Sequence, residues 1–470
     1  MKITFVYKGI YYLIDAINIE YLSAIAKNYQ YETSLIYDQD LFGVSDNVLS
    51  SPRLYKWFYD HKKFTKRIIQ ENADLIVFFD MVNSNTEWLR ETIRELKLLD
   101  QNQKTVLLSH INKPSLSDSF DYTLIGEPEF TFEAFLKNEY YRSRDKVYHF
   151  QEVANLDALP MPDKGLFEPY VNFKDSYLIF TSRGCHYGCS FCPETVFKYH
   201  FGAQYYRRRS PENVIRELKE AKRKYNIQEV IYRDSIFGID REWLKQFLDE
   251  YKKSIDVPYK CYGKAEVFDS ELAVMLKESK CYCVEFGVQT FNEPLKRNVL
   301  SRTEKTDRLK KVFEICDTHH LMYDADHIFG VPGESVEDHM EAGRIYSTFK
   351  YLNRVKCHNL VFYPEAKIHD HAPREIKEDA QYHKYFFSSI TGEKHMQMAN
   401  RCFQKYFKVL PLVPHRLNRY LQKENSWRIF RFIPNIFVGM LMFFLALKNK
   451  DKRFVIYFKY YPKKILSSIF

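Results

Sequence analysis

The sequence predicts an α/β protein in which two parallel sheets follow one another and a mainly helical region completes the chain. Two stretches, 1–140 and 176–365, alternate short apolar runs with amphipathic segments of helical period. Strands that alternate with helices pair in parallel through right-handed crossovers. At 470 residues the chain also exceeds one ordinary hydrophobic core, so more than one domain is expected.

The first stretch predicts a doubly wound, Rossmann-like domain over residues 1–140. Its unbroken apolar runs are typical of parallel strands that are buried on both faces. Helices are expected over 16–27 and 86–98, and strands over 2–7, 32–37, 73–79, 105–109 and 122–125. Ligands of such a sheet bind beyond the carboxyl ends of its strands. Residues 141–175 follow as a linker, since 156–163 holds two prolines and no clean period.

The second stretch, 176–365, predicts six strand–helix units that form a partial (β/α)6 barrel. Its strands are expected over 177–182, 229–234, 258–265, 281–289, 322–330 and 355–363. Its helices are expected over 211–225, 241–253, 270–279, 304–318 and 335–350. Ser210 and Pro211 suit the start of the first helix, as cap and first-turn residue. Sites on parallel barrels gather at the carboxyl ends of strands. Residues 366–470 are expected to cap that end.

Three cysteines follow the first strand of the expected barrel. Cys185, Cys189 and Cys192 have the spacing C-x3-C-x2-C. Soft thiolates select iron–sulfur clusters or zinc. A closed cluster site takes four thiolates, so three leave one iron with an open position, as a catalytic metal site requires. The alternative is a zinc knuckle completed by His186 or His200.

At these cysteines the chain resembles the radical S-adenosylmethionine (SAM) superfamily. The resemblance implies that the expected barrel is a radical SAM barrel whose three cysteines hold a [4Fe–4S] cluster. In that family the open iron chelates SAM, and an electron from the cluster cleaves SAM to a 5′-deoxyadenosyl radical. Phe191 matches the aromatic residue that lies near the adenine in the family.

The resemblance extends to the ends of two later strands. Asp234 and Ser235 match the segment that contacts the amino group of SAM, and a carboxylate or hydroxyl accepts hydrogen bonds from an ammonium group. Glu285 and Gln289 match a segment near the ribose and the cluster. Their even separation predicts one strand face. The alternatives are a turn role for Asp234 and, for Glu285, a charge pair with a lysine or arginine of the barrel.

A third strand end, at Ile328 and Gly330, matches the adenine-contacting strand of the family. Glycine permits close backbone approach to a planar base. A simple strand-to-helix turn would use the same residues. This motif therefore supports the family without identifying the substrate.

The first domain resembles the cobalamin-binding domain that precedes some radical enzymes. The resemblance rests on segments 19–24, 120–122 and 126–129. The cobalt-ligand motif of other cobalamin proteins is D-x-H-x-x-G, and this chain has Asp40 where the histidine would stand. The expected cofactor is therefore cobalamin bound without a histidine ligand.

The resemblance implies an enzyme that transfers a methyl group to an unactivated carbon of a small or lipid-like molecule. Methylcobalamin would donate the methyl group, and an external donor would supply electrons. The alternatives are a radical rearrangement, cyclisation or oxidation on the same scaffold. A non-enzymatic alternative is a zinc-bound interaction module with a membrane tail.

The net charge of +9 is concentrated at the C-terminal end. Residues 423–470 hold ten Lys and Arg against two acids, around an uncharged run, 432–447, that is short for a spanning helix. The segment suits either a membrane-surface anchor or a buried helix with a basic rim. Nucleic acid is a weaker partner, because the aromatic residues here do not resemble a stacking platform. Scattered cysteines and the absence of a secretory signal predict a cytoplasmic protein.

Overall fold

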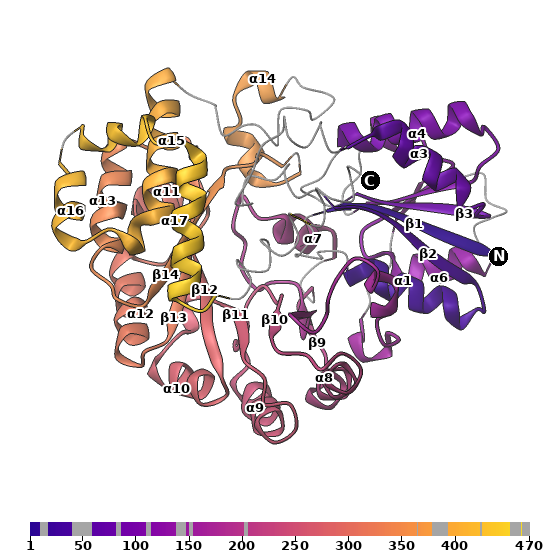
Figure 1. Ribbon diagram of the computed structural model, residues 1–470, viewed down its shortest axis with the longest axis horizontal. Coiled ribbons are helices and arrows are strands. Elements are labelled where there is room, and N and C mark those ends of the chain that lie inside the picture. The colour runs from indigo at the N-terminus through magenta and orange to yellow at the C-terminus, as the bar shows by residue number, and fades with distance from the viewer. Residues whose placement is uncertain are drawn as a thin grey trace. The chain divides into compact units, whose positions relative to one another are not determined.

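The computed structural model contains two compact units, which are described separately (Figure 1). One unit holds the described residues up to Phe173, and the other holds those from Lys174 to Asp451. The residues described are 1–9, 17–39, 59–80, 86–109, 114–137, 147–149, 154–201, 205–363, 365–377, 393–423, 425–451 and 462.

The first unit is built on a six-stranded parallel sheet. Its order is β2-β1-β3-β4-β5-β6, with Val6 paired to both Ile36 and Phe78. The strands are β1 (Lys2–Gly9), β2 (Glu32–Gln39), β3 (Leu75–Asp80), β4 (Thr105–Ser109), β5 (Tyr122–Ile125) and β6 (Val147–His149). The doubly wound prediction is confirmed, and β6 adds a strand that was not predicted. The order reverses between β1 and β3, which is where ligands of such sheets bind.

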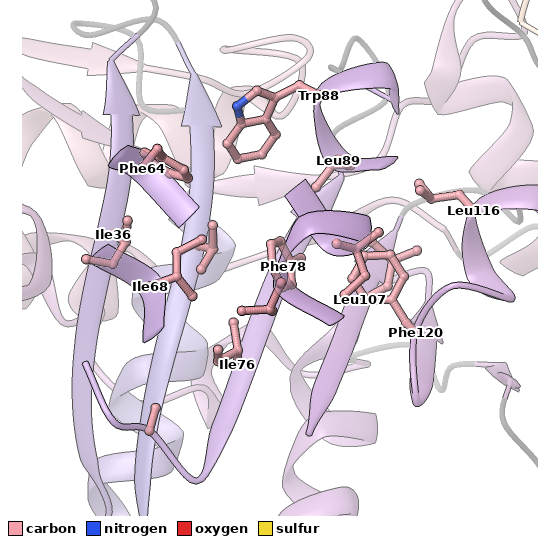
Figure 2. Packing of buried hydrophobic residues seen from close by; sticks show 14 residues of the cluster. Ile36, Phe64, Ile68, Ile76, Phe78, Trp88, Leu89, Leu107, Leu116 and Phe120 are labelled. Carbon is pink, nitrogen blue, oxygen red and sulfur yellow. The ribbon is translucent and has the colours of Figure 1, made fainter. Parts of the chain in front are cut away.

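Helices α3 and α4 pack their apolar faces on this sheet. The unit's helices are α1 (Ile17–Asn28), α3 (His61–Gln70), α4 (Thr86–Leu99), α5 (Pro114–Ser117) and α6 (Pro128–Leu136). On α4, Trp88, Leu89, Ile93 and Leu96 recur at helical spacing and are buried. Figure 2 shows Trp88 and Leu89 above Phe78 of the sheet, in a buried cluster that also includes residues of α3.

The segment 154–173, which the sequence indicated as part of a linker, packs within the first unit. Its turn η2 (Lys164–Phe167) places the Lys164 ammonium 2.6 Å from Glu20 of α1, and both side chains are almost fully buried. The Ser23 hydroxyl donates to Asp163 over 2.6 Å, and the Tyr170 hydroxyl donates to the Leu35 carbonyl over 2.8 Å. These contacts hold the segment on α1 and β2.

The second unit contains the predicted partial barrel, a six-stranded parallel sheet in sequential order. The strands are β7 (Tyr177–Ile179), β10 (Val230–Tyr232), β11 (Tyr259–Gly263), β12 (Cys281–Gln289), β13 (Met322–Phe329) and β14 (Leu352–Asn359). The helices that follow them are α8 (Pro211–Tyr225), α9 (Arg241–Ser254), α10 (Ser270–Glu278), α12 (Thr306–Thr318) and α13 (Val336–Tyr346). Ser210 caps α8 by accepting from the Asn213 amide, as predicted.

The largest error in the predicted barrel concerns its last strand. It was expected over 355–363, but β14 runs from Leu352 to Asn359, because Leu352 already pairs with Tyr323. Three elements were not predicted and are too short for a periodic signal: the hairpin of β8 (Ser182–Arg183) with β9 (Arg207–Arg208), α7 (Pro193–Phe201) and α11 (Glu293–Asn298).

The C-terminal region is helical, as predicted. Its helices are α14 (Arg374–Lys377), α15 (Lys394–Val409), α16 (His415–Leu421) and α17 (Asn435–Lys448). α15 packs against β14, and α17 packs against α15. Within the described part of the chain, no helix has the length and apolar character needed to cross a bilayer.

The buried Lys164–Glu20 pair leads to a test of the first unit. We expect Lys164→Met to destabilise it by about 3 to 5 kcal/mol, because Glu20 would remain buried without its charge partner. Hydrogen exchange of α1, followed by mass spectrometry, should accelerate accordingly. Lys27→Met is the matched control, since Lys27 is half-exposed and its 2.7 Å pair with Asp163 is worth about 0 to 1 kcal/mol. Equal acceleration in both variants would contradict the argument.

Candidate active site

The three cysteines lie in one loop at the carboxyl end of β7, between β8 and α7. The loop is closed by its own backbone, because the Cys192 amide donates to the Cys189 carbonyl over 3.2 Å. The Thr195 hydroxyl donates to the same carbonyl over 2.7 Å, and the Thr195 amide donates to the Cys192 carbonyl over 3.0 Å. The first turn of α7 thus fixes the positions of the second and third cysteines.

Ser190, between those cysteines, anchors the loop to distant parts of the second unit. Its amide donates to the Leu300 carbonyl over 3.1 Å, and its hydroxyl donates to the Val299 carbonyl over 2.5 Å. Its carbonyl accepts from the Ile368 amide over 3.0 Å. The segments after α11 and after β14 therefore meet at a buried serine. Ser190 was not predicted from the sequence, because it has no metal-ligand chemistry of its own.

Gly184 is required by the geometry at the start of the loop. Its φ is +86°, and a Cβ placed on it would lie 2.4 Å from the Tyr205 carbonyl oxygen. Only glycine fits both constraints. Gly188, inside the same loop, has open space around the equivalent position. Of the two glycines in the motif, the structure therefore requires Gly184 and leaves room for a side chain at Gly188.

The thiols of the loop are partly buried and lie within electrostatic range of one another. Burial raises the pKa of Cys185 and Cys192, and the Glu194 carboxylate and the neighbouring thiols raise both further. Among the described residues, no three His, Cys, Asp or Glu side chains surround a point that would hold a single metal ion. A cluster makes a different demand, because each thiolate binds a separate iron. Three thiols on one loop fit a cluster in donor chemistry.

The zinc-knuckle alternative has no ligand set among the described side chains. The His186 ring packs against Tyr206, with ring centroids 4.2 Å apart. The side chain of His200 lies outside the described residues. The histidine beside the first cysteine is thus engaged in an aromatic contact.

Cationic side chains surround the cysteine loop, and the sequence analysis missed them. Arg302 is buried, donates to the Gly287 carbonyl over 2.7 Å and contacts Glu304 at 2.5 Å. Burial opposes its charge, yet Cys189 and Glu304 raise the pKa of Arg302 above its usual value. Lys264 lies 4.6 Å from the centre of the Tyr187 ring and 3.5 Å from Glu304. Such fixed positive charge suits an anionic group held by thiolates.

Asp234 links the end of β10 to the start of the cysteine loop. Its buried carboxylate accepts from the Thr181 amide over 3.1 Å, from the Thr181 hydroxyl over 2.6 Å and from the Ser182 hydroxyl. Ser235, next to it, is exposed. The expected contact of Asp234 and Ser235 with the amino group of SAM stays a prediction. The observed hydrogen bonds to Thr181 and Ser182 give Asp234 a structural role, since they hold the start of the cysteine loop on β10.

Glu285 belongs to a buried charge network on the barrel strands. It lies 2.9 Å from the Lys260 ammonium and 2.5 Å from that of Lys356. Lys260 also contacts Asp324, which pairs with Arg354 at 3.0 Å. Burial opposes the charge of Asp324, but Arg354 and Lys260 keep the pKa of Asp324 well below its usual value. The alternative proposed for Glu285, a charge pair within the barrel, is the arrangement in the structure.

Gln289 lies beyond a bulge in β12, so the even spacing alone does not establish the face that it was expected to share with Glu285. Gly287 pairs with Asp326 and Gln289 with His327, so one extra residue interrupts the alternation of β12. Gln289 has φ +65°, and its amide nitrogen would lie 2.5 Å from a Cβ on Gly287. The bulge turns the Gln289 side chain back across Gly287.

The predicted Ile328 and Gly330 lie at the end of β13 and in the turn after it. Ile328 is buried, and Gly330 has φ +85° with no atom within 4 Å of its Cβ position. The Glu334 carboxylate accepts from the amides of Gly330 and Val331 over 2.7 and 3.1 Å. Asn400 of α15 donates to Glu334 over 2.6 Å. Glu334 therefore orders the turn and leaves the Gly330 backbone open to a flat ligand.

Two aromatic residues lie by the cysteine loop. Phe191, between the second and third cysteines, is half-buried. Tyr363 follows β14, and burial together with the charge of Cys192 raises its pKa. After β14, the last strand of the barrel, the chain therefore passes close to the cysteine loop that follows β7, the first strand. All of the predicted site residues lie in this unit, but their contacts with SAM stay predictions.

Comparison with known proteins relates one segment of the chain to a known family. Residues 179–344 match the family described as the Radical SAM superfamily. An uncharacterized methyltransferase of Pyrococcus horikoshii is 28% identical over 143 residues, which are 29% of this chain and 30% of that protein. A cytidylyl-2-hydroxyethylphosphonate methyltransferase of Streptomyces wedmorensis is 25% identical over 177 residues, 36% of this chain and 32% of that protein. The chain thus matches about a third of each curated relative.

Two solved structures share the fold over more of the chain. The radical SAM methyltransferase TsrM from Kitasatospora setae, bound to tryptophan and a SAM analogue, aligns with a TM-score of 0.57 and 15% identity. That alignment covers 78% of this chain and 74% of TsrM. The cobalamin-dependent radical enzyme OxsB aligns with a TM-score of 0.54 and 13% identity, over 87% of this chain and 56% of OxsB. At these identities the likeness is one of fold.

The two glycines of the cysteine loop give a matched test. We expect Gly184→Ala to strain the loop by about 2 to 4 kcal/mol, since it combines a left-handed conformation with a clash against Tyr205. Iron and sulfide incorporation after anaerobic reconstitution should fall severalfold. Gly188→Ala should incorporate as much as wild type. The interpretation fails if the two variants load equally.

Proposed function

We propose that the protein is a cobalamin-dependent radical SAM enzyme that methylates an unactivated carbon of a small molecule. The single observation that carries this proposal is the C-x3-C-x2-C loop, which lies at the carboxyl end of a parallel sheet inside the segment matched to the radical SAM superfamily. The curated relatives are named methyltransferases, which favours methyl transfer over rearrangement, cyclisation or oxidation.

In this proposal Cys185, Cys189 and Cys192 hold the [4Fe–4S] cluster, and the loop's own hydrogen bonds fix their spacing. The buried guanidinium of Arg302 balances part of the negative charge of that site. When bound, the cluster supplies the electron for cleavage of SAM, and cobalamin supplies the methyl carrier. Glu334 keeps the turn at Gly330 ordered, so that its backbone presents a flat, open surface to the adenine.

Cobalamin belongs to the proposal through the first unit. Its sheet has the strand order in which β1 and β3 form the switch point, and a flat cofactor would bind beyond their carboxyl ends. TsrM and OxsB, which share the fold, have been solved with cobalamin bound. Asp40 and the loops after β1, β3 and β4 lie outside the described residues.

The substrate class and the compartment are the finer parts of the proposal. A small substrate is favoured because TsrM is solved with tryptophan, and a lipid-like one follows only if the C-terminal surface binds a bilayer. All nine cysteines are free thiols, which suits the cytoplasm. The nine cysteines include one run with C-x2-C spacing, at Cys189 and Cys192. A second cluster that could relay electrons would need another closely spaced group, so the electrons would come from an external donor.

The motif cysteines give the first test. We expect anaerobically reconstituted protein to contain about four irons and four sulfides per chain. Cys185→Ala, Cys189→Ala and Cys192→Ala should each abolish reductive cleavage of SAM, because each removes one ligand of the cluster. Metal and sulfide analysis with chromatographic assay of 5′-deoxyadenosine measures both outcomes.

Cys402→Ala is the control for those variants. Cys402 is buried in α15, away from the motif, so this variant should keep wild-type iron and SAM cleavage. Stoichiometric zinc without sulfide in the wild type would overturn the radical enzyme and leave the zinc module in its place.

Cobalamin binding is tested separately. We expect the protein to retain hydroxocobalamin after gel filtration, with the absorption spectrum of a form that lacks a histidine ligand, because Asp40 stands at the candidate position. Asp40→Ala should leave that spectrum unchanged. Failure to retain cobalamin would reduce the proposal to a radical SAM enzyme without it, and a histidine-ligated spectrum would contradict the expected ligation.

A further inference from the structure

Helix α17 presents its apolar side chains to solvent. Within the described residues 425–451, eight large apolar side chains are between 41% and 79% exposed. They are Ile429, Phe432, Ile436, Phe437, Met440, Leu441, Phe444 and Leu447. Val438, Leu445 and Ala446 face inward and are buried. A surface helix normally turns its polar side outward, so an apolar outer face of this size indicates a binding surface.

The helix is fixed to the rest of its unit at both ends. At its start, the Lys405 ammonium of α15 donates to the Phe430 and Ile433 carbonyls over 3.2 and 2.7 Å. At its end, Asp451 pairs with Arg354 at 3.2 Å, and Asn449 donates to Asn353 over 2.8 Å. The outward orientation of the apolar face is therefore imposed by contacts on the opposite side. Figure 1 shows α17, in yellow, as a straight helix beside α15.

The charge around this face is of one sign. Arg428 and Arg431 are exposed before the helix, and Lys448 and Lys450 are exposed at its end. Among the described residues of 425–451 the single acid is Asp451, which is buried against Arg354. Basic groups at both ends of an apolar strip complement a surface that is apolar within and anionic at its rim. A second copy of this chain would instead bring two positive rims together.

We propose that the α17 face, defined as these eight apolar side chains with the four basic ones, docks on an anionic lipid bilayer. The helix has 14 residues. At about 1.5 Å per residue it is too short to cross a hydrocarbon core of about 30 Å, so it lies in the plane of the interface. The apolar side chains enter the boundary of the acyl chains, and the basic ones contact lipid phosphates. This inference does not depend on the proposed chemistry.

Vesicle flotation with the full chain tests the proposal. We expect binding to vesicles that contain phosphatidylglycerol at low salt, weaker binding at high salt and little binding to pure phosphatidylcholine. Lys448→Gln with Lys450→Gln should weaken binding about 25-fold, at about fivefold for each basic group. Phe437→Ser with Phe444→Ser should weaken it more than tenfold at either salt concentration, because the loss is apolar.

Matched controls are available on other surfaces. Leu98→Ser with Leu99→Ser removes two exposed apolar side chains from α4, and Lys252→Gln with Lys253→Gln removes two exposed charges from α9. Both control variants should float as wild type does. All variants should keep wild-type cleavage of SAM after reconstitution, which shows that they fold and separates this test from that of the proposed function.

Two outcomes would overturn the proposal. One is wild-type protein that stays with the unbound fraction at low salt on anionic vesicles. The other is a concentration-dependent dimer, measured by analytical ultracentrifugation, that Phe437→Ser with Phe444→Ser abolishes. The second result would assign the α17 face to a second copy of this chain.

Discussion

The cysteine loop depends on the hydrogen bonds of Ser190, because a short loop with three thiols has no regular structure of its own. Through Ser190 the loop is bound to the segment after α11 and to the segment after β14. Asp234, just after the neighbouring strand β10, accepts hydrogen bonds from Thr181 and so fixes the chain that leads into the loop. The geometry of the thiols is thus set by residues outside the proposed ligand set, and such surrounding residues commonly orient the ligands of a metal site.

The barrel strands carry a second constraint, the buried charges of Lys260, Glu285, Asp324 and Arg354. Burying each charge costs several kcal/mol, and removing one partner would leave another uncompensated. The cations lie on the outer strands β11 and β14 and the carboxylates on β12 and β13 between them, so each carboxylate has a cation within 3 Å. The network therefore ties four adjacent strands together and also reaches Asp451, at the end of α17. The barrel and the C-terminal helix are coupled through it.

The C-terminal region takes part in the site through α15. The Asn400 amide nitrogen donates to Glu334, which orders the turn at Gly330, and the Asn400 amide oxygen accepts from the His339 ring over 2.8 Å. The same helix holds α17 through Lys405. Helix α15 thus links the turn at Gly330, which is expected to contact the adenine, with the α17 face, which is proposed to bind a bilayer. A shift of α15 would therefore change the positions of both.

By itself the sequence determined the fold class, most of the strands in both sheets and the position of the cysteine motif. Hydrophobic period and capping residues such as Ser210 act locally, so strands and helices could be placed within a few residues. Several elements were not predicted, and most of them are short and depend on contacts outside themselves: α3, α5, α6, β6, α7, α11 and the β8–β9 hairpin. The start of β14 was missed for the same reason, since pairing with Tyr323 decides it.

Tertiary structure alone decided which side chains support the motif. Ser190, Arg302 and Glu334 each contact a partner that is distant in sequence, namely Val299, Gly287 and Asn400, and their neighbours carry no signal for it. It also decided the contacts of Glu285, whose cations come from β11 and β14, and of Gln289, whose side chain lies beside Gly287 after a bulge in β12. The sequence identified the apolar C-terminal segment and its basic flanks but did not decide whether its apolar side is buried or exposed. The contacts of Lys405 and Asp451 decide that its apolar side faces outward, because they fix the opposite side of the helix.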